Sequence, residues 1–262
     1  MRLSIILPCF NEVDNVAKLQ EEFLPVLSKL LETHTVDTLV IDSIEVIFVD
    51  DGSSDDSWLA LNGAFGKLSV PGVSFNFARH PHNLGLGAAL RTGFALATGE
   101  IIVTTDCDGT YAFATIPDIL ALMDERTDIV TASPYHPSGG VDGVPAYRLI
   151  LSQGSSFIYR VLVDRHIHTY TALFRAYRSE VIKNITFSSN NYLAGTELMV
   201  KGMLSGFSVA EYPTILHQRR FGASKAKTIN TIKEHLVFQS WILLYRLHLT
   251  QFNRDALSIS GD

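Results

Sequence analysis

Cysteine is scarce in this chain: Cys9 and Cys107 are the only two among 262 residues. Two cysteines cannot build the disulfide framework of a small secreted protein, and their separation matches no zinc-binding pattern. The chain also opens directly on RLSIILPCF, without the charged and then apolar leader that marks a signal peptide. We therefore expect reduced thiols and a cytoplasmic location.

Charge and long apolar runs are limited as well. Acidic residues outnumber basic ones by 27 to 21, and the net charge of −6 argues against a general nucleic-acid-binding protein, which needs a basic surface. The longest charge-free apolar stretch near the C-terminus, LVFQSWILLY, has about half of the roughly 20 residues that a membrane-spanning helix needs. Apolar residues still make up 47% of the chain, which is enough for a large core.

Short apolar runs alternate with longer helical patterns in the first half of the chain. The runs LSIILP, EVIFVDD, VSFNFA, IIVTTD and DIVTAS are separated by helical patterns over 14–32, 54–67, 84–97 and 115–125. This alternation predicts an α/β domain with a mostly parallel sheet and helices on both faces. Pro25 is expected to kink or split the first helix. One large domain is a simpler interpretation of the length than two small ones.

Beyond residue 134 the alternation ends. The segment SPYHPSGGVDGVPAYR is rich in glycine and proline and predicts a loop. The patterns that follow predict helices near 146–163, 194–205 and 228–248, and strands near 169–177 and 207–217.

Polar residues follow the predicted strands of the first half, and ligands of open α/β sheets bind at the carboxyl ends of the strands. The pair Asp106 and Asp108 follows IIVTT, where two carboxylates predict a site for a hard divalent cation, Mg²⁺ or Mn²⁺, that shares a nucleotide diphosphate. Solvent-exposed surface acids are the alternative. The other candidates at this edge are Asn11, Glu12, Asp50, Asp51 and Arg79.

Three further segments each allow two interpretations. VDDGSSDDS is either a capped helix start or a base- or ribose-binding site, whereas NLGLGAALRTG lacks the third glycine of a dinucleotide fingerprint because Leu90 stands there. HQRRFGASKAK carries five basic side chains and no acid, which suits either a solvated surface or phosphate capture: His217, Arg219, Arg220, Lys225 and Lys227.

The last predicted helix, 228–248, carries an amphipathic apolar stripe that includes Ile229, Leu236 and Leu243. It packs either onto the domain, or onto a second subunit in a homo-oligomer, or lies on a membrane surface as a peripheral contact.

The segments SIILPCFNE, VIFVDDGSSDDS, NLGLGAALRTGFALATGEIIVTTDCDG, YLAGTELM and RRFGASK together resemble the family 2 glycosyltransferases. The resemblance runs over residues 3–228 and is closest to the dolichol- and polyprenol-phosphate mannose synthases. It implies a GT-A fold that transfers a hexose from a GDP- or UDP-sugar donor with inversion and with a divalent metal. The implied organisation is a transferase domain over 1–227, with a nucleotide-binding half (1–133) and an acceptor half (134–227), followed by an amphipathic helix and tail (228–262).

The same resemblance assigns roles by position. The nucleotide pocket would be lined by Pro8, Asn11, Glu12, Asp50, Asp51 and Asp106. Asp106 would also contact the metal, and Asp108 matches the principal metal ligand. Arg219, Ser224 and Lys225 match a loop that contacts phosphates, and Arg148 and Ser152 match a pair beside the acceptor phosphate.

The chain departs from this branch at three landmarks. Ser133-Pro134-Tyr135 replaces Ser-Arg-Tyr, so a phosphate-binding arginine is missing. Thr169 stands where these enzymes carry an aspartate, and Thr110 replaces a glutamine of the metal site.

These departures leave the acceptor open. A polyprenyl or dolichyl phosphate needs cations and no base, and Arg148, Arg219 and Lys225 would supply them. A glycan or small-molecule hydroxyl needs a general base, for which Glu197 is the candidate. A nucleotide-sugar-binding subunit that has lost catalysis is the third interpretation.

Overall fold

The computed structural model of the chain describes residues 1–33, 35–36, 39–219 and 228–250. Its centre is a seven-stranded sheet with the order β10-β7-β9-β6-β1-β4-β5, in which β9 runs antiparallel to both of its neighbours and the other pairs are parallel. The predicted mostly parallel sheet is confirmed. The strands are β1 (Arg2–Cys9), β4 (Ser43–Asp50), β5 (Val73–Arg79), β6 (Ile101–Thr104), β7 (Ile129–Ser133), β9 (Arg175–Arg178) and β10 (Val209–Pro213).

The central strands are buried on both faces, as their unbroken apolar runs predict. Residues 3–7 of β1 and 44–50 of β4 are all buried. The register pairs Cys9 with Asp50, so β1 and β4 end at the same level of the sheet. The polar segments that follow both strands therefore emerge side by side.

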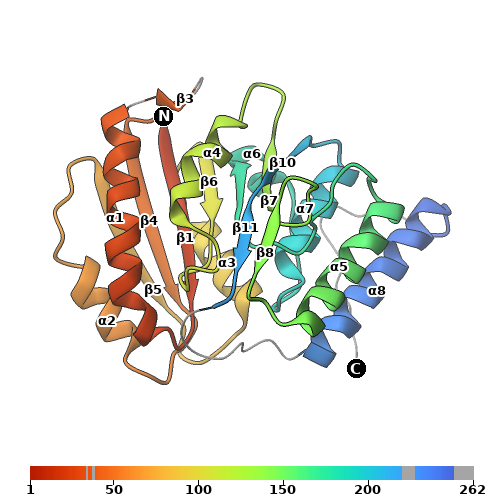
Figure 1. Ribbon diagram of the computed structural model, residues 1–262, viewed down its shortest axis with the longest axis horizontal. Coiled ribbons are helices and arrows are strands. Elements are labelled where there is room, and N and C mark those ends of the chain that lie inside the picture. Colours follow the sequence, from red (N-terminus) through yellow and green to blue (C-terminus); the bar gives the residue numbers. More distant parts are fainter. Residues whose placement is uncertain (34, 37–38, 220–227, 251–262) are drawn as a thin grey trace.

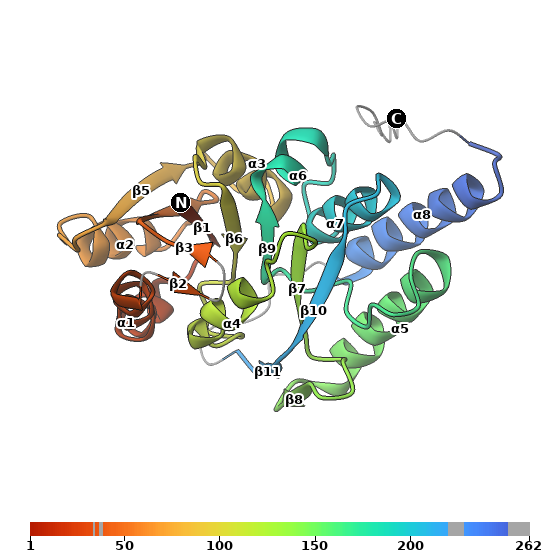
Figure 2. The same cartoon turned by 90° about the horizontal axis from the view of Figure 1, so that it is seen from above.

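Helices cover both faces of the sheet (Figures 1 and 2). One face carries α1 (Val16–Thr33), α2 (Ser57–Phe65) and α4 (Ile116–Ala121), and the other carries α3 (Leu86–Leu96), α6 (Ser179–Asn184) and α7 (Ala194–Leu204). Two 3₁₀ turns, η1 (Val13–Asn15) and η2 (Phe113–Thr115), precede α1 and α4. Pro25 does not split α1, because it lies on the exposed side of the helix, where water can bind the carbonyl group that loses its partner.

Two predicted strands differ from the observed ones. The strand expected near 207–217 is divided into β10 and β11 (Ile215–His217), and β11 pairs with β8 (Gly140–Asp142) inside the predicted loop. The strand expected near 169–177 is limited to β9. Residues before β9 bind side chains in place of a neighbouring strand: the carbonyl group of Tyr170 accepts hydrogen bonds from Arg175 and Thr196. A short antiparallel pair, β2 (Thr35–Val36) and β3 (Leu39–Val40), follows α1.

The helices α5 (Ala146–Leu162) and α8 (Thr228–Arg246) lie side by side beyond the β10 end of the sheet (Figure 1). The hydroxyl of Tyr159 on α5 lies 2.9 Å from Nδ1 of His235 on α8. Phe238 and Ile242 of α8 are buried in the core beneath α7, which confirms that one side of the amphipathic helix packs onto the domain. Within the described residues, none of the helices is long and apolar enough to cross a membrane.

Candidate active site

A pocket of about 720 Å³ opens at the carboxyl ends of β1, β4 and β6. Its other walls come from the start of α5, the segment after β11 and the first residues of α8. A volume of this size is typical of a small-ligand site. The structure brings eight of the predicted site residues to this pocket: Pro8, Glu12, Asp51, Asp106, Asp108, Arg148, Ser152 and Arg219.

The carboxylates of Asp106 and Asp108 line the pocket just beyond β6. Oδ1 of Asp108 accepts a hydrogen bond from the backbone N–H of Thr110 at 3.0 Å and another from its hydroxyl at 2.5 Å. Burial, followed by the negative charge of Asp108, raises the pKa of Asp106 to about 8. Two acids that repel each other in this way favour a bound cation.

The donor atoms at this point fit a hard divalent metal. Carboxylate oxygens are ligands of Mg²⁺ and Mn²⁺, which bind through one or two carboxylates and complete their shell with phosphate and water. In the described part of the chain, no group of three or more His, Cys, Asp or Glu side chains has the arrangement of a metal site. Asp106 and Asp108 would therefore hold such an ion together with a ligand that supplies phosphate oxygens.

Arg219 lies between two of the pocket acids. Its guanidinium group forms an ion pair with Glu12, and its Nε lies 3.2 Å from Oδ2 of Asp108. The second carboxylate oxygen of Glu12 accepts a hydrogen bond from Asn15 at 2.6 Å. The positively charged guanidinium group of Arg219 is therefore held beside the paired acids, where it can bind a phosphate. Ser224 and Lys225, the other two members of the predicted phosphate loop, lie outside the described residues.

Asp51 reaches the pocket, but its oxygens organise the protein. They accept hydrogen bonds from the backbone N–H groups of Leu84 and Gly85 at 2.9 and 2.8 Å, and from the amide of Asn83 at 2.9 Å, and Oδ1 lies 2.7 Å from the ring of His80. Gly85 has a φ of +99°, a conformation that side chains other than glycine rarely adopt. Asp51 thus fixes the turn that begins α3.

Asp50 and Asn11 lie behind the pocket wall, and neither is among its lining residues. Asp50 is fully buried, with Nε of Arg79 3.0 Å from its Oδ2. Oδ1 of Asn11 accepts a hydrogen bond from the backbone N–H of Ser54 at 2.8 Å. Both residues hold the segment after β4 in place.

Glu197 also lies away from the pocket lining. Its side chain is almost completely buried in α7, and its carboxylate accepts hydrogen bonds from the backbone N–H groups of Ser188 and Ser189. Nζ of Lys201 lies 2.7 Å from Oε1 and also donates to the carbonyl group of Thr186. A carboxylate with these partners anchors the segment before α7.

Arg148 and Ser152 line the pocket on the first turns of α5. They are four residues apart, so both side chains lie on the same side of the helix. The hydroxyl of Ser152 lies 2.6 Å from that of Thr171. The pair presents a cation and a hydroxyl group to the pocket.

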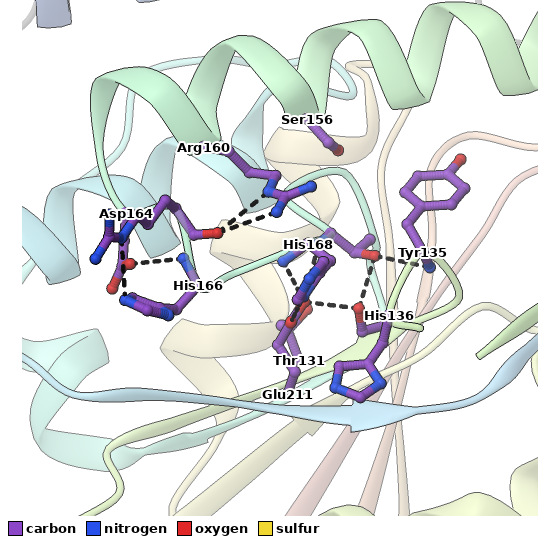
Figure 3. A network of polar contacts seen from close by, with 12 residues as sticks. Thr131, Tyr135, His136, Ser156, Arg160, Asp164, His166, His168 and Glu211 are labelled. Carbon is purple, nitrogen blue, oxygen red and sulfur yellow. Dashed lines mark hydrogen bonds and ion pairs between the residues drawn. The ribbon is translucent and has the colours of Figure 1, made fainter. Parts of the chain in front are cut away.

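The two segments that carry the departures at Pro134 and Thr169 meet in the structure. The hydroxyl groups of Ser133 and Thr169 lie 2.9 Å apart, and Thr169 also accepts a hydrogen bond from the backbone N–H of Tyr135. Figure 3 shows Glu211 of β10 beneath this network, close to His168. Glu211 accepts hydrogen bonds from Ser133 and from the backbone N–H groups of His168 and Thr169, and its Oε2 lies 2.7 Å from Nδ1 of His168. The carboxylate of Glu211 thus lies beside Thr169 and holds this segment against Ser133.

Several pocket residues were not predicted from the sequence. They carry no charge, and local sequence patterns do not show which uncharged side chains reach a pocket: Asn83, Leu86, Tyr135, Asn191, Tyr192, Gln218, Asn230 and Thr231.

Sequence comparisons with known proteins give the same family that the sequence motifs indicate. The model of the family described as glycosyl transferase family 2 matches residues 4–186. The polyprenol monophosphomannose synthase of Mycolicibacterium smegmatis is 30% identical over 94% of this chain and 89% of its own length. The dolichol-phosphate mannosyltransferase of Pyrococcus furiosus is 28% identical over 90% of this chain, which spans 62% of that protein.

Solved structures show the same fold. The glucosyl-3-phosphoglycerate synthase of Mycobacterium tuberculosis, in complex with Mn²⁺, UDP and glucosyl-3-phosphoglycerate, superimposes with a TM-score of 0.63 at 17% identity, over 95% of this chain and 81% of that one. Its complex with Mg²⁺ and UDP gives a TM-score of 0.62 at 16% identity, over 95% and 80% of the two chains. The fold of this chain is GT-A, as predicted.

Proposed function

Because the chain belongs to glycosyl transferase family 2, we propose that it transfers a hexose from a GDP- or UDP-sugar, with inversion, to a polyprenyl or dolichyl phosphate. The names of the Mycolicibacterium and Pyrococcus relatives support this acceptor class. The complexes of the synthase from Mycobacterium tuberculosis support a nucleotide-sugar donor and a divalent metal.

On the donor side, Asp106 and Asp108 would hold Mg²⁺ or Mn²⁺. When bound, this ion supplies a Lewis acid that neutralises charge on the leaving diphosphate. Arg219 adds a positive charge beside the same acids, and Lys225 is proposed to do so from the following loop. Pro8, Glu12 and Asp51 border the space for the nucleotide.

On the acceptor side, the observation that carries the proposal is the pair Arg148 and Ser152 at the pocket end of α5. A phosphate that enters there meets a guanidinium group and a hydroxyl group, and as an anion it attacks without losing a proton. The pocket carboxylates offer no spare base: Glu12 pairs with Arg219, Asp51 is hydrogen-bonded on both oxygens, and Asp106 and Asp108 form the proposed metal site. Glu197 is enclosed by Lys201 and two backbone N–H groups.

The outer face of α5 suits a lipid. From the pocket end onward it exposes apolar side chains at helical spacing, with exposed fractions between 36% and 71%: Tyr147, Ile150, Leu151, Phe157, Ile158 and Val161. The neighbouring α8 exposes Ile229, Leu236 and Leu243. We propose that α5 and α8 lie on a membrane surface and admit the lipid phosphate to Arg148.

A sugar hydroxyl is the second candidate acceptor, and His217 favours it. His217 lines the pocket, and its Nδ1 lies 3.3 Å from Oδ2 of Asp142. An imidazole that pairs with a carboxylate in this way can take a proton from a hydroxyl group.

A donor and acceptor screen tests the proposal. The protein would be incubated with Mn²⁺, with GDP-mannose or UDP-glucose, and with either polyprenyl phosphate or a soluble glycan. We expect product with the lipid phosphate, and we expect His217→Ala to retain most of this activity. If product forms only with the glycan, and if His217→Ala abolishes it, the acceptor is a sugar hydroxyl and the lipid-phosphate proposal is wrong.

The metal site is tested by Asp108→Ala. The variant removes one of two carboxylate ligands, so we expect at least a hundredfold loss of turnover, comparable to the effect of chelating the metal. Glu125→Ala removes an exposed acid outside the pocket and serves as the control. Turnover of Asp108→Ala equal to that of the control would defeat the proposed metal role.

A further inference from the structure

Tyr192 is a large aromatic side chain that is 44% exposed in the wall of the pocket. In the part of the chain that the structure describes, its hydroxyl group has no hydrogen-bond partner. It precedes α7 and opens the segment YLAGTELM, in which the sequence assigned a role to Glu197 only. An aromatic ring with a free hydroxyl group offers both an apolar face and a hydrogen-bond donor to a ligand.

The charged groups of the pocket act on the pKa of the phenol in opposite directions. Burial, followed by the charges of Asp106 and Asp108, raises the pKa of Tyr192 to about 12, whereas the charge of Arg148 lowers it. The phenol is therefore protonated at neutral pH and remains a donor. Tyr192 lines the same pocket as the residues of the proposed diphosphate site and of the proposed acceptor site.

The segment that carries Tyr192 is held at several points. Glu197 accepts hydrogen bonds from the backbone N–H groups of Ser188 and Ser189, and the carbonyl group of Ser189 accepts one from Arg91 at 3.0 Å. The amide of Asn191 donates to Oε1 of Glu234 on α8 at 2.5 Å. A side chain on such a segment holds its place in the pocket before a ligand arrives, which favours recognition of a rigid ligand.

In a glycosyl transfer, the migrating sugar lies between the leaving diphosphate and the attacking group. Because Tyr192 lines the same pocket as Asp106, Asp108 and Arg148, we infer that it binds the transferred hexose: its ring covers a C–H face of the sugar, and its hydroxyl group donates a hydrogen bond to a sugar oxygen. This inference rests on the proposed function, because it requires a nucleotide-sugar donor.

Binding measurements separate the sugar from the nucleotide. Calorimetric titrations with Mn²⁺ present would compare GDP with GDP-mannose, and UDP with UDP-glucose. We expect Tyr192→Ala to weaken binding of the preferred nucleotide sugar about tenfold, which is about 1.4 kcal/mol, and that of its nucleoside diphosphate less than twofold. Tyr192→Phe keeps the ring, so we expect it to lose less affinity for the nucleotide sugar than Tyr192→Ala does. Leu59→Ala, which removes an apolar side chain of α2 with 68% exposure outside the pocket lining, is the control.

Each outcome has a definite meaning. If Tyr192→Ala binds nucleoside diphosphate and nucleotide sugar equally weakly, or both as tightly as the unmodified protein, the inference is wrong and the proposed function is unaffected. If the unmodified protein binds neither nucleotide sugar, the inference and the proposed function both fall. Tyr192→Leu, which preserves apolar volume, replaces Tyr192→Ala if urea unfolding shows that the alanine variant is not folded.

Discussion

Gly87 lies where the first turn of α3 meets the segment that carries Asn191 and Tyr192. Its backbone N–H donates a hydrogen bond to the carbonyl group of Asn190 at 2.8 Å, and a Cβ atom at this position would overlap the carbonyl oxygen of Ser189. The close approach joins the turn fixed by Asp51 to the segment fixed by Glu197. The glycines of NLGLG therefore serve close packing between two walls of the pocket.

We expect Gly87→Ala to reduce the free energy of unfolding by about 1–3 kcal/mol, because the added methyl group forces the two segments apart. It should also weaken nucleotide-sugar binding, since Tyr192 moves with its segment. Gly63→Ala is the matched control: Gly63 lies inside α2 with no atom within 4 Å of the added carbon, so the same change should stabilise the protein by about 0.5–1 kcal/mol. Urea unfolding measures the stability of both variants. Equal unfolding midpoints for Gly87→Ala and Gly63→Ala would contradict the packing argument.

At the scale of elements, α5 and α8 are joined through a buried histidine. Burial lowers the pKa of His235 to about 4, so its ring is neutral at pH 7 beside the hydroxyl group of Tyr159. The unfolded chain binds the proton with a pKa near 6.5. Between these two values the unfolded state carries more protons than the folded state, so stability falls as the pH is lowered from about 6.5 to about 4.

The difference between the two pKa values predicts that the free energy of unfolding falls by up to about 3 kcal/mol between pH 6.5 and pH 4. His235→Gln keeps a polar group at this position but does not titrate, so its stability should depend less on pH than that of the unmodified protein. Urea unfolding at pH 7.5, 6 and 5 gives the comparison. The control is His82→Gln, which replaces an exposed histidine. If His235→Gln and His82→Gln lose stability in parallel, His235 is not the titrating group.

At the scale of the whole molecule, the pocket opens beside the exposed apolar faces of α5 and α8. Among the described side chains, Ile150 is 70% exposed and Phe157 is 64% exposed, and both are on α5. The proposed lipid acceptor would account for this exposed apolar surface. The basic side chains of α5, Arg148 and Arg160, are compatible with phosphate headgroups.

We expect Ile150→Glu and Phe157→Glu each to reduce binding to phosphatidylcholine vesicles that contain polyprenyl phosphate by about tenfold, because each removes an apolar side chain worth about 1.5–3 kcal/mol and adds a charge. Leu59→Glu is the control, since Leu59 is 68% exposed on α2. Vesicle flotation measures the bound fraction. Equal flotation of all three variants would remove the membrane surface from the proposal and leave the pocket as described.

The sequence by itself determined the parallel sheet, its unbroken apolar strands, and the acids Asp106 and Asp108 beyond β6, because these features depend on local patterns of a few residues. It also indicated the family, through motifs that lie within short segments. The positions of α5 and α7 followed from helical periodicity alone, which predicted helices near 146–163 and 194–205.

The tertiary structure decided which polar side chains face the pocket. Asp50 and Asp51 are neighbours, yet successive side chains of an extended segment point to opposite sides, so Asp51 reaches the pocket and Asp50 meets Arg79. Glu197 lies on the helix that follows Tyr192, yet Lys201 and two backbone N–H groups enclose it. Tyr192, Asn230 and Thr231 enter the site from distant segments, because long-range packing, which no local pattern encodes, sets where helices end.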